Sequence, residues 1–132
     1  LFCSVACPHF KIPARWTVAR DCLSIYLEEK KKIKTYFITF PSRICLTTDT
    51  WTSSQNLGYM TLTAHFIYRM WILHKKIINF FPIVGHTGEI IGKSIENFLI
   101  DWGITTKVLT VTLDNASANN VGIDYLRDKL IS

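Results

Sequence analysis

Two aspartates stand at the ends of strand-like runs and have hydroxyl or amide side chains as neighbours. Asp49 lies in the stretch LTTDTWTS, from Leu46 to Ser53, and Asp114 ends the apolar part of VLTVTLDNASANN. Two carboxylates held close together repel each other unless a cation lies between them, and oxygen-only sites favour Mg²⁺ or Mn²⁺. The pair therefore suggests a divalent-metal site suited to phosphoryl transfer. The alternative is that both are ordinary strand-end residues and that Asp114 caps a turn or helix.

The apolar pattern predicts one helix followed by the element order β-β-β-α-β-α. The expected elements are a helix over 14–37, strands over 43–50, 59–68 and 71–81, a helix between Thr87 and Gly103, a strand over 107–113 and a helix over 116–130. The short connection at Arg69-Met70 makes the first three strands an antiparallel meander. A helical crossover then returns the fourth strand parallel to an earlier one. If that neighbour is the first strand, Asp49 and Asp114 lie side by side.

Apolar stripes predict which helix faces pack. The expected inward residues are Ala19, Cys22, Leu23, Tyr26, Ile33 and Phe37 in the first helix, Ile91, Ile95, Phe98, Leu99 and Trp102 in the second, and Val121, Tyr125 and Leu126 in the last. Thr87 is the expected N-cap of the second helix, and Ser117 or Asn119 that of the last. Pro82 and Gly85 are expected to break the third strand, and the fourth strand reads as central because both of its faces are apolar.

Length and charge bound the possible functions. A chain of 132 residues forms one domain at most, and its net charge of +5 with a pI near 9.1 is compatible with nucleic-acid binding without requiring it. The lysine-rich run EEKKKIK, from Glu28 to Lys34, reads as a solvated helix face. No apolar run approaches the ~20 residues that cross a bilayer, so we expect no membrane partner. The chain opens on Leu1, and we expect it to be a fragment.

The four cysteines do not form a recognisable zinc motif. Cys3, Cys7 and His9 could supply part of a zinc site, but no second ligand pair follows at finger spacing, and Cys22 and Cys45 stand apart. Free thiols in a reducing compartment are therefore the favoured interpretation.

Other polar and aromatic residues have structural explanations that compete with functional ones. Trp51 is predicted to pack in the core rather than to stack on a base, and His65, His74 and His86 are predicted to be structural histidines. Asn115 and Asn119 either orient a carboxylate or phosphate or cap a helix. Lys75 and Lys76 face either DNA or solvent, and they cannot both lie on one face of a regular strand. The nucleic-acid-binding residues stay unassigned.

Four segments closely resemble the hAT-superfamily transposases, and within them the RICESLEEPER-like zinc finger BED domain-containing proteins. The segments are LTTDTWTSSQNLGYMTLTAHFI, LHKKIINFFPI, GEIIGKSIENFLIDWGI and VTLDNASANNVGIDYL. The resemblance runs from about Lys11 to Leu130, in order and at the family's spacing. It implies an α/β, RNase H-like fold with a catalytic Asp-Asp-Glu triad that binds Mg²⁺ or Mn²⁺.

The resemblance also assigns roles to the two aspartates. Asp49 matches the first acid of the triad, on strand one, and Asp114 matches the second, at the end of strand four. The family's third acid, a glutamate, comes from a helix beyond a long insertion that is not in this sequence. Asp124 and Asp128 lie on the helix after strand four, where neither can replace it. Residues 41–132 are thus expected to be the N-terminal half of the RNase H-like domain, residues 14–40 an upstream amphipathic helix, and residues 1–13 stay unassigned.

These expectations lead to three functional hypotheses. In the first, the chain is a nuclear, DNA-associated, transposase-derived fragment that does not cut or join DNA by itself and holds metal weakly or not at all. In the second, it is part of an intact transposase with metal-dependent DNA cleavage and strand transfer, which dimerises through a region outside this sequence. In the third, it is a non-functional transposon remnant, and an uncovered sheet makes it poorly soluble.

Overall fold

The computed structural model describes residues 5–7, 9–83, 87–114 and 119–130. The chain divides into two compact units, Leu1–Ile33 and Lys34–Ser132, and each is described by itself. Gly85, His86, Asn115 and Ser117 lie outside the described residues, so the structure does not test the predictions made for them.

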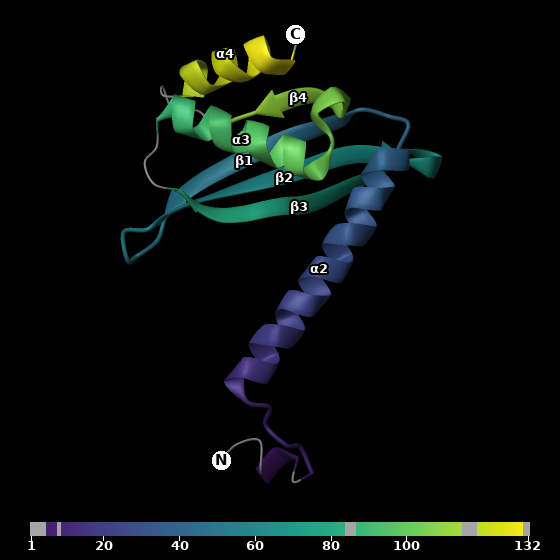
Figure 1. Cartoon of the computed structure of the whole chain (residues 1–132), viewed down its shortest axis with the longest axis vertical. Helices are drawn as coiled ribbons and strands as arrows, with labels where there is room; N and C mark the ends of the chain where they lie inside the picture. The colour runs from purple at the N-terminus through teal and green to yellow at the C-terminus, as the bar shows by residue number, and fades with distance from the viewer. Residues whose placement is uncertain (1–4, 8, 84–86, 115–118, 131–132) are drawn as a thin grey trace. The chain divides into compact units, whose positions relative to one another are not determined.

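Helix α2 (Arg15–Thr39) is the long helix that the sequence predicts, and it passes from the first unit into the second (Figure 1). In the first unit the expected apolar stripe is exposed, with Leu23 at 57% and Tyr26 at 51%. In the second unit Phe37 is fully buried, and so nearly is Phe40, at 4% exposure. The helix is therefore confirmed, whereas packing of its stripe is seen only near its C-terminal end.

A four-stranded mixed sheet forms the centre of the second unit. It contains β1 (Ile44–Thr52), β2 (Gly58–Tyr68), β3 (Ile72–Ile83) and β4 (Val108–Thr112), in the order β3-β2-β1-β4. The β1–β2 and β2–β3 pairs are antiparallel, and the β1–β4 pair is parallel. The predicted meander and the parallel fourth strand are both confirmed.

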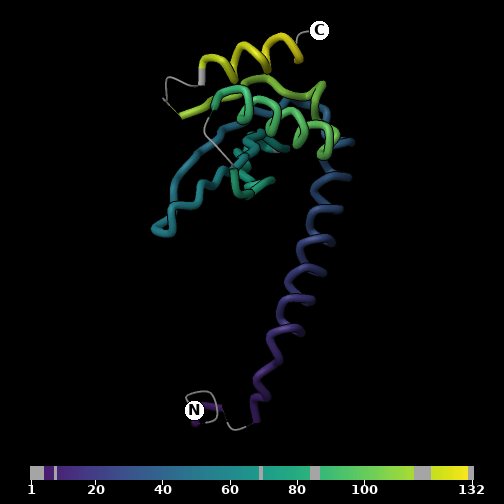
Figure 2. The backbone as a smooth tube through the Cα atoms, turned by 60° about the vertical axis from the view of Figure 1, so that its left-hand side comes forward, coloured from purple at the N-terminus to yellow at the C-terminus, as the bar shows by residue number. Residues whose placement is uncertain are grey.

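Helices α3 (Gly88–Trp102) and α4 (Asn119–Leu130) complete the second unit. Figures 1 and 2 both show α3 lying between α4 and strands β2 and β3. Trp102 donates from its indole Nε1 to the side-chain oxygen of Asn79 on β3 at 2.6 Å, and the rings of Phe98 and Phe81 lie 4.4 Å apart. These contacts place α3 against the sheet, as the sequence predicts.

The core lies between α3 and the facing side of the sheet. Its fully buried side chains, at 0% exposure, are Phe37, Ile44, Leu46, Met60, Leu62, Ala64, Ile95, Leu99 and Ile104. The burial of one such large aliphatic side chain contributes about 1.5–3 kcal/mol. On β1 the buried residues alternate, Ile44, Leu46 and Thr48, so the residues between them point to the opposite side of the sheet.

The predicted ends of α3 are confirmed. The Thr87 hydroxyl accepts a hydrogen bond from the Ile90 backbone N–H at 3.5 Å, which caps the first turn. Gly103 has a φ of 67° and donates its N–H to the carbonyls of the last turn. A residue with a Cβ is disfavoured in this left-handed conformation, which is why glycine suits the position.

The prediction that Pro82 ends the third strand is wrong, because β3 continues to Ile83. Among the described residues β3 pairs with β2 alone, and a proline is tolerated on an edge strand because no ladder hydrogen bond is lost there. The central position predicted for the fourth strand is also wrong within the described residues. There β4 pairs with β1 alone, and its Leu109 is 59% exposed.

The inward face predicted for the last helix is only partly correct. Leu126 is buried at 3% exposure, whereas Val121 is 59% exposed. Gly122 is buried instead, because α4 meets α3 at this glycine and the close approach turns Val121 outward. Of the helices that the structure describes, none combines the length and apolar character that a bilayer crossing needs.

Candidate functional site

The parallel pairing of β1 with β4 brings the two aspartates to the same edge of the sheet. Thr47 on β1 is the register partner of Thr112 on β4. Asp49 lies two residues beyond Thr47, and Asp114 lies two residues beyond Thr112. Neighbouring strands are about 4.8 Å apart, so the segments that carry the two aspartates run side by side as far as Thr112, the last paired residue of β4. The expectation that the fourth strand neighbours the first is thus confirmed.

Both aspartates are exposed, and nearby hydroxyl groups contact them. The Thr50 hydroxyl donates to Asp114 Oδ2 at 3.5 Å, which links the two strands where β4 ends. The Thr61 hydroxyl donates to the backbone carbonyl of Asp49, also at 3.5 Å. Because both residues are exposed, their carboxylates are reachable from solvent, as ligands for an entering cation must be.

The donors at this edge fit part of a hard-cation site. Carboxylate oxygens are the ligands that Mg²⁺ and Mn²⁺ prefer, and Mg²⁺ usually takes its remaining ligands from water or from substrate phosphates. In the described part of the chain, no three His, Cys, Asp or Glu side chains gather closely enough to hold a metal ion. Asp124 and Asp128 both lie on α4, and the Asp124 carboxylate pairs with Arg127 at 3.0 Å. Asp49 and Asp114 are thus the two acids that the β1–β4 pairing brings to this part of the sheet.

An aromatic cluster lies beside Asp49 on the side of the sheet opposite α3. Trp51 stacks on Tyr59, with ring centroids 6.0 Å apart, and Phe80 lies 5.6 Å from Trp51 and 5.4 Å from Tyr59. Trp51 is 39% exposed and Phe80 is 61% exposed. The prediction that Trp51 belongs to the core is wrong, because period-two alternation turns it away from α3.

His65 and His74 have hydrogen-bonding or packing partners. His65 Nε2 lies 2.9 Å from the Thr47 hydroxyl across the β1–β2 pair, and the His74 ring stacks on Phe66 at 5.5 Å. These contacts support the structural role that the sequence predicts for both. Cys7, Cys22 and Cys45 are free thiols, as expected, while Cys3 lies outside the described residues. Lys75 and Lys76 pair with His65 and Ala64, so they point to opposite faces, as predicted.

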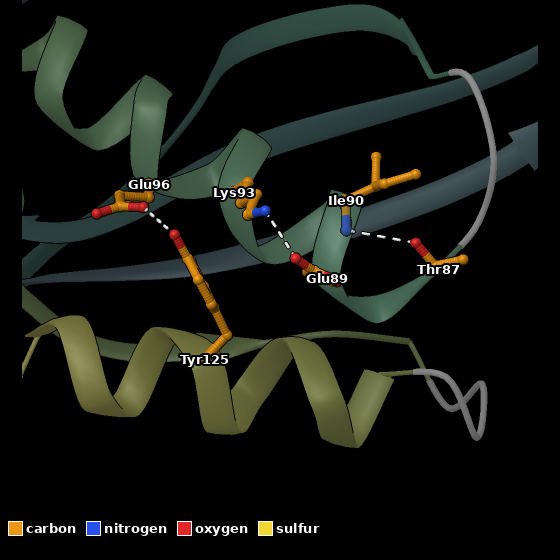
Figure 3. A network of polar contacts seen from close by, with 6 residues as sticks. All are labelled: Thr87, Glu89, Ile90, Lys93, Glu96 and Tyr125. Carbon is orange, nitrogen blue, oxygen red and sulfur yellow. Dashed lines mark hydrogen bonds and ion pairs between the residues drawn. The ribbon is translucent and has the colours of Figure 1, made fainter.

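A polar network joins α3 to α4 and holds the helix that follows Asp114 (Figure 3). The Tyr125 hydroxyl donates to Glu96 Oε2 at 2.5 Å, and this hydrogen bond raises the pKa of Tyr125. On α3, Lys93 lies 2.6 Å from Glu89, and its hydrogen bond lowers the pKa of Glu89 and raises that of Lys93 itself.

Glycine allows this helix pair to approach closely. An ideal Cβ added to Gly122 would lie 2.7 Å from the backbone carbonyl oxygen of Gly88, which is closer than real Cβ atoms come. One added to Gly92 would lie 2.9 Å from the Tyr125 ring. The direction of the chain after Asp114 therefore depends on two glycines that the sequence interpretation did not single out.

Lys107 is another residue whose role the sequence did not reveal. Its ammonium donates to the backbone carbonyls of Phe37, Ile38 and Phe40, at 2.6, 2.9 and 2.8 Å. It thereby ties the C-terminal end of α2 to the residue before β4 and supports the β1–β4 pair. A lysine before a strand carries no sequence signal for such a contact, because its acceptors are backbone atoms about seventy residues away along the chain.

Comparisons with known proteins agree with this architecture. The family model described as the ZBED1 RNase-like domain matches residues 47–132. A Zea mays protein with the name "Putative AC transposase" is 40% identical over 123 residues, covering 92% of this chain and 15% of that protein. The protein RICESLEEPER 2 of Oryza sativa subsp. japonica, a zinc finger BED domain-containing protein, is 34% identical over 125 residues, covering 93% of this chain and 17% of its own length.

A third relative, the zinc finger BED domain-containing protein DAYSLEEPER of Arabidopsis thaliana, is 34% identical over 124 residues, covering 93% of this chain and 18% of that protein. No solved structure matches the chain at a significant level. The chain thus spans less than a fifth of the length of these relatives. The predicted likeness to transposases and RICESLEEPER proteins is confirmed, as is the mixed α/β, RNase-like fold. The chain belongs to the ZBED1 RNase-like domain family.

Proposed function

We propose that this chain is part of a transposase-derived, DNA-associated nuclear protein and that it does not cut or join DNA by itself. The names of its relatives, which include transposases and zinc finger BED proteins, support an association with DNA in the nucleus. Its net charge of +5 is compatible with binding to phosphates.

The observation that carries the proposal is the parallel pairing of β1, which contains Asp49, with β4, which ends two residues before Asp114. These two carboxylates would hold Mg²⁺ or Mn²⁺ as part of a larger ligand set. When bound, the ion would supply charge stabilisation at a phosphate oxygen. The chain's own contribution is to hold the two carboxylates at one edge of the sheet, where the Thr50 hydroxyl contacts Asp114.

The proposed lack of DNA cleavage rests on the number of metal ligands that the chain supplies. The residues that the structure describes bring no third acid or imidazole to Asp49 and Asp114. Two carboxylates hold such an ion weakly, because Mg²⁺ favours near-octahedral coordination and the remaining positions would fall to water. As a second candidate, the chain is part of a longer, active transposase. The 40% identity to the Zea mays relative favours this candidate.

The metal site is tested by titrating the chain with Mn²⁺ and measuring free Mn²⁺ by electron paramagnetic resonance. We expect weak binding that Asp49→Ala and Asp114→Ala each reduce at least about tenfold, since each removes a charged ligand. Asp124→Asn, on α4, serves as the matched control and should bind as the wild type does. Equal affinity in the wild type and in Asp49→Ala would refute the assignment of the site.

DNA association and catalysis need a separate experiment. Binding of a labelled duplex oligonucleotide should weaken as salt rises, because phosphate contacts release counterions. With Mg²⁺ or Mn²⁺ present the oligonucleotide should remain uncut. Cleavage that Asp49→Ala abolishes would refute the claim that the chain is inactive by itself, and binding indistinguishable from that of a neutral protein would refute DNA association.

A further inference from the structure

The connection between β2 and β3 presents two large apolar side chains to solvent. Met70 and Trp71 are 88% and 87% exposed, and both have left-handed backbone conformations, with φ of 63° and 60°. Tight hairpin turns with positive φ ordinarily use Asn and Gly, which adopt this conformation with little strain. Methionine and tryptophan at these positions, here called the hairpin tip, strain the backbone at positive φ and expose apolar surface to water. Such a combination points to a role in contact with another molecule.

The hairpin tip forms one wall of a groove of about 850 Å³ in the second unit. The groove is lined by residues from the end of α2, the segment that leads into β1, and the adjoining ends of the strands. Its aromatic part includes Tyr36, Phe40 and Tyr68. The ring centroid of Tyr36 lies 5.3 Å from that of Phe40 and 5.4 Å from that of Tyr68. A groove of this size accommodates several side chains of a bound segment.

The exposed apolar surface extends from the groove along both strands. Ile67 and Tyr68 at the end of β2 are 47% and 38% exposed, and Ile72 and Leu73 at the start of β3 are 54% and 67% exposed. Together with the hairpin tip they span positions 67 to 73 of the sequence, interrupted by Arg69. Protein interfaces are enriched in aromatic residues, methionine and arginine, which is the composition found here.

The positive charge of Arg43 in the groove favours a bound segment that carries acidic residues. Among the lining residues that the structure describes, Arg43 is the one fully charged side chain, and none is acidic. The Arg43 guanidinium donates to the Val108 carbonyl at 3.4 Å, a long contact that leaves it able to pair with an anion. Lys75 and Lys76, both exposed, lie further along β3 outside the groove lining and point to opposite faces of the sheet, so one of them shares a face with the groove. A bound segment that carries acidic residues beside its apolar ones would complement this surface.

Nucleic acid fits the groove less well than such a segment. A protein that binds a phosphate backbone contacts several phosphates with separate lysines and arginines. The described part of the groove lining offers a single guanidinium and is mainly aromatic and aliphatic. The observations therefore favour an amphipathic protein segment.

We propose that the groove and hairpin tip bind an acidic amphipathic segment of a partner protein. Its apolar residues occupy the groove against Trp71, Met70 and Tyr68, and its acidic residues pair with Arg43. This site is separate from the one formed by Asp49 and Asp114, because none of its lining residues is an aspartate or glutamate. It does not depend on metal binding.

Fluorescence anisotropy of the complete chain with a labelled synthetic peptide tests the proposal. The peptide carries leucine and phenylalanine on one helical face and glutamate on the other. One control peptide has lysine in place of glutamate, and another has serine in place of the apolar residues. We expect saturable binding of the acidic amphipathic peptide, and binding at least about tenfold weaker for each control, as for the loss of a hot-spot contact.

Two variants locate the binding surface. The double variant Met70→Asn, Trp71→Gly installs the residues that the turn favours, so its urea midpoint should stay the same or rise while peptide affinity falls at least about tenfold. Arg43→Glu should weaken binding of the acidic peptide and improve that of the lysine peptide. A lowered urea midpoint in the double variant would assign the two side chains a structural role and overturn the proposal.

Two other outcomes would show that the surface binds a different molecule. Displacement of the peptide by duplex DNA, with affinity for DNA lost in the double variant, would identify a nucleic-acid surface. Dimerisation in sedimentation velocity, abolished by the same variant, would identify a contact with a second copy. Each result contradicts the proposed partner, as does equal binding of the acidic and lysine peptides.

Discussion

Replacing Lys107 with methionine tests how the C-terminal end of α2 is joined to the residue that precedes β4. The ammonium group has three N–H donors, and each is directed to a different carbonyl, those of Phe37, Ile38 and Phe40. Methionine has a similar length and fills the same space without donating. The substitution therefore removes the hydrogen bonds and the charge at the C-terminal end of α2 with little change in packing.

The expected loss follows from these contacts. A hydrogen bond between neutral groups contributes about 1 kcal/mol net, and one from a charged donor contributes about 1.5–3 kcal/mol. Lys107 is half-buried, so water can replace part of each bond in the variant. A positive charge at the C-terminal end of a helix adds about 0.3–1 kcal/mol. We expect Lys107→Met to lower the free energy of unfolding by about 2–4 kcal/mol.

Pulse proteolysis in urea measures this change on the complete chain and tolerates limited solubility. With an m-value of about 2 kcal/mol/M, the urea midpoint should fall by about 1–2 M. Lys107→Arg should recover part of the loss, because a planar guanidinium keeps the charge but cannot direct three donors as an ammonium does. Lys93→Met makes the same replacement at an exposed ion pair with Glu89, and should change the midpoint little.

Two results would refute the reasoning. If the Lys107→Met midpoint equalled that of Lys93→Met, the three carbonyl contacts would contribute nothing to stability. If Lys107→Arg matched the wild type, the charge alone would account for the effect, and the geometry of the three donors would be irrelevant.

Three further predictions concern the helix pair and the end of α3. Gly122→Ala should lower the free energy of unfolding by about 1–3 kcal/mol despite alanine's helix propensity, because its Cβ would press on the Gly88 carbonyl; a raised urea midpoint would contradict this. Gly103→Ala should destabilise by about 1 kcal/mol through its positive φ, and Gly103→Asn by less, so equal midpoints for the two would count against the backbone explanation. The hydrogen bond to Glu96 raises the pKa of Tyr125 above the usual tyrosine value of 10.0, so its contribution to stability should be full below pH 10.0 and lost as pH rises through the raised pKa. In an ultraviolet titration of tyrosinate, Tyr125→Phe should lack the tyrosine that titrates last in the wild type. An unchanged titration curve would refute the assignment.

Much of the fold follows from short-range sequence patterns. Alternating residues predict β2 correctly, and Thr87 and Gly103 mark both ends of α3, because caps depend on neighbouring backbone atoms. The predictions that failed concern which strand lies at an edge and which face of a strand or helix is covered. Pro82 and Val121 are examples, since their positions depend on neighbours that are distant in the sequence.

The sequence alone determined the candidate acids, Asp49 and Asp114, and the family likeness, because both are carried by residue types at particular spacings. The tertiary structure decided that β4 joins β1 in parallel, which places the segments that carry those acids side by side across a sequence separation that no local rule bridges. It also decided the positions of Lys107 and the hairpin tip. Their contacts and exposure depend on how distant segments fold around them, which local propensity does not encode.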